Sequence, residues 1–167
     1  MKDFRITGSN ITGKIPDFIR NWSQLETLVI MGTSMGGPIP SGISVLQNMT
    51  VLIITDLKGP GSGFPLLHNM KNLKKLILRN CLISGQIPSY IGTLTNLEIL
   101  DLSFNNLSGQ VPQSISGLTV RAVFLRNNKL TGAIPDWVYR STINLYVLST
   151  NKSVLPGTPC YYSVCII

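Results

Sequence analysis

A Gly-x-Ile-Pro-like segment returns at a nearly fixed period along this chain, and that period constrains the fold more than any other feature. Successive prolines of these segments are 24, 25, 23, 24 and 23 residues apart. Glycine stands three residues before every one of these prolines except the third, which lies in GPGSGFP. A period of this length indicates stacked structural repeats. The prolines are Pro16, Pro40, Pro65, Pro88, Pro112 and Pro135.

Upstream of each such segment lies an L-x-x-L-x-L frame with conservative replacements. The alternation predicts a short strand whose apolar side chains point inward, and such strands can bury them only by stacking into a parallel sheet. Seven units are expected over residues 1–151, starting near 1, 25, 49, 73, 97, 120 and 143, followed by an irregular tail over 152–167. The frames are Met1-Phe4-Ile6, Leu25-Leu28-Ile30, Met49-Leu52-Ile54, Leu73-Leu76-Leu78, Leu97-Leu100-Leu102, Val120-Val123-Leu125 and Ile143-Tyr146-Leu148.

The residues after each proline should return the chain along the opposite, convex side in turns and 3-10 segments. Glycine permits the bend that leaves the strand, and proline fixes φ where the return begins. Ile91 and Leu94 are expected to point inward there. Trp137 occupies the place of Phe18 and Tyr90 and is expected to serve packing.

Composition excludes several classes of function. With 44% hydrophobic and 13% charged residues the chain should fold, and its net charge of +7 favours acidic partners. Nucleic acid is not expected, because the cations are not interleaved with stacking aromatics. His68 is the only histidine. We find no catalytic pairing and no metal spacing, and expect no cofactor, no enzymatic activity and no membrane contact from this chain.

Cys81 lies in LILRNCLISG, which returns as VFLRNNKLTG with Asn128 in its place. A position that accepts either Cys or Asn is part of the repeat, where an inward side chain can bond backbone groups that the turn leaves unpaired. We therefore predict a buried structural thiol, because free cysteine is among the most buried residue types. The full column reads Ser9, Thr33, Leu57, Cys81, Asn105, Asn128 and Asn151.

The concave sheet would display the residues between the leucines, side by side at about 4.8 Å per repeat. One such column ends in Asp101, Phe124 and Val147. Arginines held on a rigid sheet can bind carboxylate, phosphate or sulfate through forked hydrogen bonds. The alternative is that the cations only solvate the surface and pair with Asp101 and Glu98. The candidate ligand-binding residues are Lys74, Lys75, Arg79, Asp101, Arg121, Phe124 and Arg126.

An excess of N-x-S/T sequons favours the secretory route. Asn151 belongs to the same inward column as Cys81 and is therefore the least suitable acceptor. Cys160 and Cys165 form a candidate disulfide in an oxidising compartment. The expected glycosylation sites are Asn10, Asn21, Asn48 and Asn106.

Residues 97–112, LEILDLSFNNLSGQVP, resemble the plant-specific leucine-rich repeat, L-x-x-L-x-L-x-x-N-x-L-x-G-x-I-P, at every position if Val replaces Ile. The resemblance implies a solenoid of α/β-type repeats. Stretches such as MKDFRITGSNITGKIPDFIRNW are similar to one group of plant receptor-like serine/threonine kinases. In that group a malectin-like domain, one transmembrane helix and a kinase follow the repeats. The resemblance to this group implies that the chain is an extracellular region at the cell surface and that it binds a peptide, a cell-wall saccharide or a co-receptor protein.

The chain departs from that pattern in three ways. Related peptide receptors often carry Arg-x-Arg, where this chain has Ile77-x-Arg79 and Phe124-x-Arg126. The paired-cysteine cap is missing, and no kinase follows, so we expect a truncated fragment that is marginally stable or self-associating. The competing function is a secreted leucine-rich-repeat inhibitor of a cell-wall-degrading enzyme.

Overall fold

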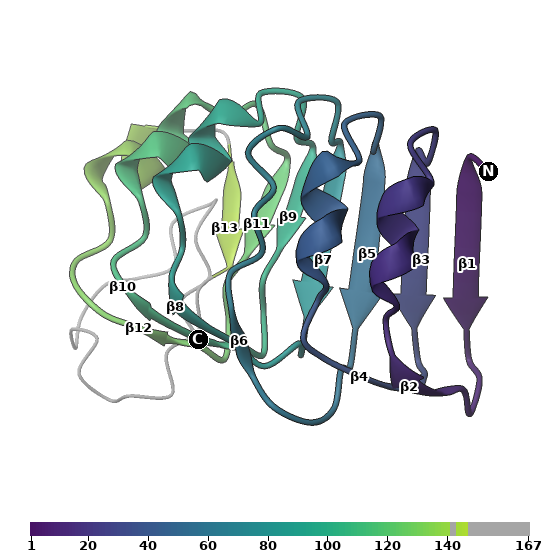
Figure 1. The fold of residues 1–167 in the computed structure, drawn as a ribbon. Coiled ribbons are helices and arrows are strands. Elements are labelled where there is room, and N and C mark those ends of the chain that lie inside the picture. The colour runs from purple at the N-terminus through teal and green to yellow at the C-terminus, as the bar shows by residue number, and fades with distance from the viewer. Residues whose placement is uncertain (141–142, 147–167) are drawn as a thin grey trace.

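The computed structural model describes residues 1–140 and 143–146, and its dominant element is a parallel sheet with one strand from each repeat (Figure 1). Neighbouring strands in this sheet come from successive repeats, so the described residues form a solenoid. The expected leucine-rich-repeat solenoid of about seven repeats is confirmed. The strands are β1 (Asp3–Thr7), β3 (Thr27–Met31), β5 (Val51–Thr55), β7 (Lys75–Arg79), β9 (Ile99–Asp101), β11 (Ala122–Phe124) and β13 (Asn144–Tyr146).

The apolar frame positions form continuous ladders through the solenoid. Leu28, Leu52, Leu76, Leu100 and Val123 pair in register across β3 to β11, and all five are 0% exposed. Burying such a side chain contributes roughly 1.5–3 kcal/mol. No single repeat could bury these residues, so the stacking of repeats creates the core.

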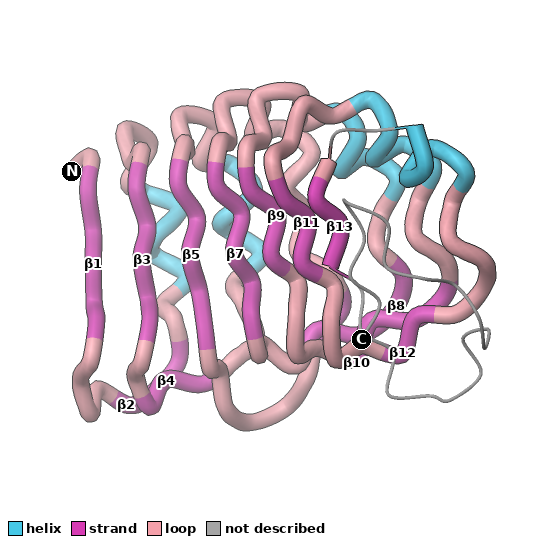
Figure 2. The backbone as a smooth tube through the Cα atoms, turned by 180° about the vertical axis from the view of Figure 1, so that it is seen from behind, coloured by secondary structure: helices cyan, strands magenta, loops and turns pink. Residues whose placement is uncertain are grey.

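Short 3-10 helices follow five of the six repeat prolines, all except Pro65, on the side opposite the large sheet, as predicted (Figure 2). In the first four, proline precedes the helix with φ between −63° and −76°. One buried branched residue per helix reaches the core, namely Ile19, Ile43, Ile91, Ile115 and Val138 in turn. The helices are η1 (Asp17–Asn21), η2 (Ser41–Val45), η3 (Ser89–Thr93), η4 (Gln113–Gly117) and η5 (Asp136–Arg140).

Two further parallel sheets lie at the edge where the chain leaves the large sheet, and the sequence analysis had expected only turns there. One sheet pairs two strands and the other has four, in the order β12-β10-β8-β6. The extended segment around each repeat glycine places its backbone beside that of the next repeat, so the strands pair. These strands are β2 (Thr12–Lys14), β4 (Ser34–Gly36), β6 (Ser62–Gly63), β8 (Ile83–Gln86), β10 (Asn106–Gly109) and β12 (Lys129–Leu130).

Buried asparagines connect adjacent repeats where the chain leaves the large sheet. The Asn105 side-chain oxygen accepts hydrogen bonds from the backbone N–H groups of Cys81 and Ile83, both at 3.0 Å. Its side-chain nitrogen donates to the carbonyls of Leu78 and Leu102 at 2.6 and 2.9 Å. Asn128 repeats the pattern one unit later by accepting from the Leu107 N–H. The predicted polar ladder therefore exists in this half of the chain.

The register of the last strand differs from the sequence prediction by one residue. The frame Ile143-Tyr146-Leu148 assigns Tyr146 to the inward position, but Leu145 pairs with Val123 and Tyr146 with Phe124. Leu145 is 1% exposed and Tyr146 is 37% exposed. A one-residue shift moves every side chain to the opposite face of a strand, and burying a leucine avoids placing a phenol hydroxyl in the core. The frame prediction was wrong here, and Leu148 lies outside the described residues.

Candidate functional site

All seven predicted ligand-binding residues lie on or beside three neighbouring strands. We call the solvent-facing side of the large sheet the strand face. Lys75 and Arg79 are the two end residues of β7, and Lys74 directly precedes it. Asp101 and Phe124 end β9 and β11 and pair with one another across the sheet. Arg121 directly precedes β11, and Arg126 follows two residues after it.

Arg79 and Arg126 meet at the ring of Phe104, a residue that the sequence analysis did not select. The Arg79 guanidinium carbon lies 4.6 Å from the ring centroid, and that of Arg126 lies 5.3 Å from it. The ring belongs to the repeat between the two arginines. Cation–π attraction therefore holds two positive groups near one another. Each such contact stabilises by about 0.5–1 kcal/mol at exposed sites.

Phe104 also has an unusual backbone. Its φ is +60°, in the left-handed region that bulky residues rarely adopt. The same repeat position is left-handed in each of the first six repeats, with Gly8, Gly32, Asp56, Asn80 and Asn127 at φ between +53° and +62°. Those five are of the types that tolerate this conformation. An aromatic residue in a column that otherwise holds glycine, asparagine or aspartate is visible in the sequence, and it indicates a candidate functional position.

The acidic residues neutralise little of this cluster. Arg121 and Glu98 form an ion pair at 3.8 Å with the arginine side chain 81% exposed, so its contribution is small. The Asp101 carboxylate instead accepts hydrogen bonds from the backbone N–H and hydroxyl of Ser103. Among the described residues, none of the remaining four cations of the cluster forms an ion pair. Of the alternative in which the cations pair with Asp101 and Glu98, the Arg121–Glu98 pair is present, and among the described residues no ion pair joins Asp101 to a cation.

Asp56 borders the cluster beside Arg79. Its carboxylate accepts hydrogen bonds from the Thr55 hydroxyl at 2.6 Å and the Asn80 amide at 2.9 Å. Partial burial acts to raise the pKa of Asp56, but these two hydrogen bonds and the charge of Arg79 together hold the pKa below its ordinary value. The carboxylate therefore stays ionised and marks one edge of the positive surface.

An aromatic pair borders the cluster on the other side. The rings of Phe124 and Tyr146 stack with their centroids 4.6 Å apart and their planes 6° apart. Tyr146 was not predicted on this face, because the sequence frame assigned the slot to Val147, and only the pairing of β13 with β11 reveals it. The strand face thus presents guanidinium groups next to a flat aromatic surface.

Cys81 is confirmed as a buried thiol. It is 3% exposed, and its Sγ donates to the Ile54 carbonyl at 3.2 Å. Burial is the largest cause that raises its pKa to about 12. Because the thiolate is the reactive form, this residue is not a nucleophile at neutral pH.

The remaining predicted sites are spread along the chain. Asn10 and Asn21 are exposed and Asn106 is half-buried. The Asn48 side chain is exposed, but its nitrogen donates to the Ser23 carbonyl at 3.0 Å. Cys160 and Cys165 lie outside the described residues, as does the tail over 152–167. In the part of the chain that the structure describes, no acidic, histidine or cysteine cluster suits a metal ion, and no helix is suited to span a membrane.

Comparisons with known proteins agree with this architecture. The family described as Leucine Rich repeats (2 copies) matches residues 71–118. A probable LRR receptor-like serine/threonine-protein kinase of Arabidopsis thaliana is 48% identical over 108 residues, which are 64% of this chain and 10% of that protein. The chain therefore spans about a tenth of the length of this curated relative.

Solved structures show the same fold. The Arabidopsis receptor kinase HAESA, in complex with the peptide hormone IDA and the co-receptor SERK1, matches with a TM-score of 0.80 and 29% identity over 87% of this chain and 26% of that one. A plant ice-binding protein matches with a TM-score of 0.72 and 28% identity over 82% of this chain and 47% of that one. Proteins of different function share this solenoid, so the fold alone does not assign one.

Proposed function

We propose that this chain is an extracellular ligand-binding region of a plant receptor-like kinase and that it binds an acidic peptide on the strand face over β7, β9 and β11. One observation carries the proposal. Two guanidinium groups flank the Phe104 ring and form no ion pair among the described residues. The likeness to a receptor kinase that binds a peptide hormone supports the same assignment.

The chemistry of the surface favours a carboxylate-bearing ligand with an apolar segment. Arginine can hold a carboxylate by two parallel hydrogen bonds, and the cation–π contacts leave the outer edges of the guanidinium groups free to donate. The stacked rings of Phe124 and Tyr146 offer flat apolar area beside these donors.

Binding of acidic and neutral peptides of equal length tests this proposal by calorimetry. The variant Arg79→Ala/Arg126→Ala should weaken binding of the acidic peptides roughly 10- to 100-fold, the loss expected for charge-assisted hydrogen bonds. The control Arg20→Ala/Lys129→Ala removes the same charge from exposed positions outside the large sheet. Equal affinity of the two double variants would refute the proposed site.

The finer assignments belong to the same proposal. We assign the chain to the receptor-kinase group with a malectin-like domain and to the cell surface, reached by the secretory pathway with glycans on its sequons. A full-length transcript that encodes repeats, a malectin-like domain and a kinase would support this, and one that encodes only a signal sequence and repeats would not.

An inhibitor of a cell-wall-degrading enzyme is the competing function. The same basic surface would suit the acidic cleft of such an enzyme. Inhibition of a polygalacturonase that the Arg79→Ala/Arg126→Ala variant loses, without binding of any acidic peptide, would favour the inhibitor.

A further inference from the structure

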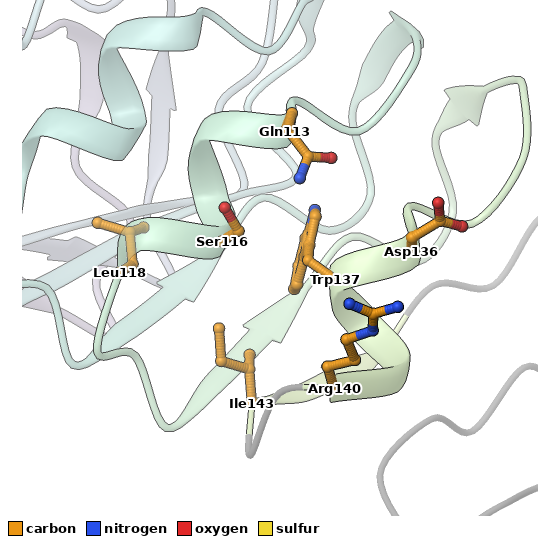
Figure 3. A pocket seen from close by; sticks show the side chains of 7 residues that line it. All are labelled: Gln113, Ser116, Leu118, Asp136, Trp137, Arg140 and Ile143. Carbon is orange, nitrogen blue, oxygen red and sulfur yellow. The ribbon is translucent and has the colours of Figure 1, made fainter.

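A candidate for a second site lies on the helix side of the solenoid, away from the strand face. A cavity of about 580 Å³ opens between η4 and η5, a size typical of ligand pockets. Figure 3 shows its lining, which combines an indole ring, two aliphatic side chains and four polar side chains. The lining residues are Gln113, Ser116, Leu118, Asp136, Trp137, Arg140 and Ile143.

The cavity lies where η5 has a large ring at the helix position that is glycine in η2 and serine in η4. A Cβ added to Gly92 of η3 would lie 2.3 Å from the Ser114 carbonyl oxygen of η4, so these two helices touch through their backbones. The residue of η5 that corresponds to Ser114 is Trp137. The indole prevents the same close approach, and η5 touches η4 far less than η4 touches η3.

The Trp137 side chain has a feature typical of a binding site, a buried hydrogen-bond donor that lacks an acceptor among the described residues. It is 7% exposed, and its indole N–H has no hydrogen-bond partner in the described residues. A buried donor without an acceptor costs about 1–3 kcal/mol. The Gln113 side chain points toward the indole nitrogen, yet no hydrogen bond joins them (Figure 3). A ligand hydroxyl both donates and accepts, so it can join the two groups whichever way the amide is turned.

The rest of the lining limits the chemistry of the ligand. Asp136 and Arg140 are both exposed at the cavity and carry opposite charges, so the site has no net charge to attract an ion. Leu118 and Ile143 supply apolar surface. A sugar ring matches this combination, because its hydroxyl edge needs planar polar groups and its C–H face packs on aromatic and aliphatic surface. We propose that the cavity between η4 and η5 binds a saccharide.

Tryptophan fluorescence tests this directly. The chain has two tryptophans, so the variant Trp22→Phe makes Trp137 the only tryptophan reporter. Titration with cellotriose, xylotriose or the core pentasaccharide of an N-linked glycan should change its emission saturably for one of them. A response to a linear trimer identifies a cell-wall oligosaccharide, and a response to the branched core identifies a glycoprotein glycan.

Variants separate this site from its surroundings. In the Trp22→Phe background, Gln113→Ala and Asp136→Asn should each weaken binding about tenfold, as expected for one lost hydrogen bond. The matched control is Asp17→Asn, which changes the same residue at the same position of η1 and should leave affinity unchanged. Thermal unfolding checks that all variants fold alike.

Three results would overturn the inference. They are no saturable change of emission with any of the three saccharides, a loss of affinity in Asp17→Asn equal to that in Asp136→Asn, or an affinity that the cavity variants leave unchanged. The Arg79→Ala/Arg126→Ala variant should bind the saccharide normally. Failure of the cavity therefore leaves the proposed peptide site untouched, and the converse also holds.

Discussion

The Arg79 guanidinium lies 4.6 Å from the centre of the Phe104 ring, and Phe104 has a φ of +60°. A non-glycine residue held in the left-handed region costs of order 1–3 kcal/mol and persists where its surroundings enforce it. Cation–π contacts with Arg79 and Arg126 offset part of this cost. The chain keeps an aromatic ring where the other five of its first six repeats place glycine, asparagine or aspartate.

Replacing Phe104 by asparagine should therefore change stability and binding differently. Relief of backbone strain offsets the lost cation–π contacts, so the free energy of unfolding should stay within about 1 kcal/mol of the wild type. Affinity for the acidic peptide should fall, because the two guanidinium groups lose their support. Urea unfolding and calorimetry measure both effects.

The reverse substitution in the same column provides the control. Asn127 has a φ of +53°, and Asn127→Phe should destabilise the chain by about 1–2 kcal/mol. Loss of more than about 2 kcal/mol by Phe104→Asn would show that packing of the ring outweighs its strain.

Asn105→Ala should be among the most destabilising substitutions in the chain. It leaves the buried N–H groups of Cys81 and Ile83 without their acceptor, which predicts a loss of about 3 kcal/mol or more. Asn96→Ala is the control, because the exposed Asn96 amide makes one hydrogen bond, to the Lys71 carbonyl at 2.8 Å, and should cost about 1 kcal/mol. Equal losses in chemical denaturation would contradict the special role of the buried ladder.

Two glycines of the 3-10 helices should respond oppositely to alanine. Gly92→Ala places a Cβ 2.3 Å from the Ser114 carbonyl oxygen and should destabilise the chain by about 1–3 kcal/mol. At Gly117 nothing lies within 4 Å of an added Cβ, so Gly117→Ala should be neutral or stabilising by up to about 1 kcal/mol. Thermal unfolding of the pair measures the difference, and a neutral Gly92→Ala would contradict close packing of η3 on η4.

The Cys81 thiol should make stability fall at high pH. Its pKa of about 12 in the folded chain is above the ordinary value of 9.0, so stability is fully present below pH 9 and is lost as the pH rises toward 12. The slope between these limits is about 1.4 kcal/mol per pH unit. Comparison with Cys81→Ala isolates this contribution from other titrating groups.

Thiol chemistry provides a second measurement. In a Cys160→Ser/Cys165→Ser background, Cys81 should not react with a disulfide reagent at pH 8 until denaturant is added, because the thiolate is absent and the sulfur is buried. Rapid reaction of the native protein would contradict this.

Glycan occupancy should differ among the sequons. Asn10 and Asn21 are exposed and should carry glycans when the protein is expressed in plant cells. Asn48 should be occupied less, because the nitrogen that would carry the glycan lies 3.0 Å from the Ser23 carbonyl of the neighbouring repeat. Mass spectrometry of glycopeptides gives the occupancy of each site, and full occupancy of Asn48 alone would contradict the ranking.

The sequence by itself determined the solenoid, because the period of the apolar frame and the proline leaves one way to bury Leu28, Leu52, Leu76 and their equivalents. It also determined the inward place of Cys81 and Asn105 and the gathering of cations over three strands. These are properties of a linear repeat, in which position along the chain translates directly into position in space.

Only the tertiary structure decided features that depend on contacts between repeats. The register of β13 placed Tyr146 beside Phe124, since burial of Leu145 outweighed the ideal frame. The ring of Phe104 came to lie near Arg79 and Arg126 of its two neighbours. The cavity beside Trp137 opened because the large indole faces η4, which on its other side packs against Gly92 of η3. Side-chain size and neighbouring backbone settle such contacts, and no single repeat contains both partners.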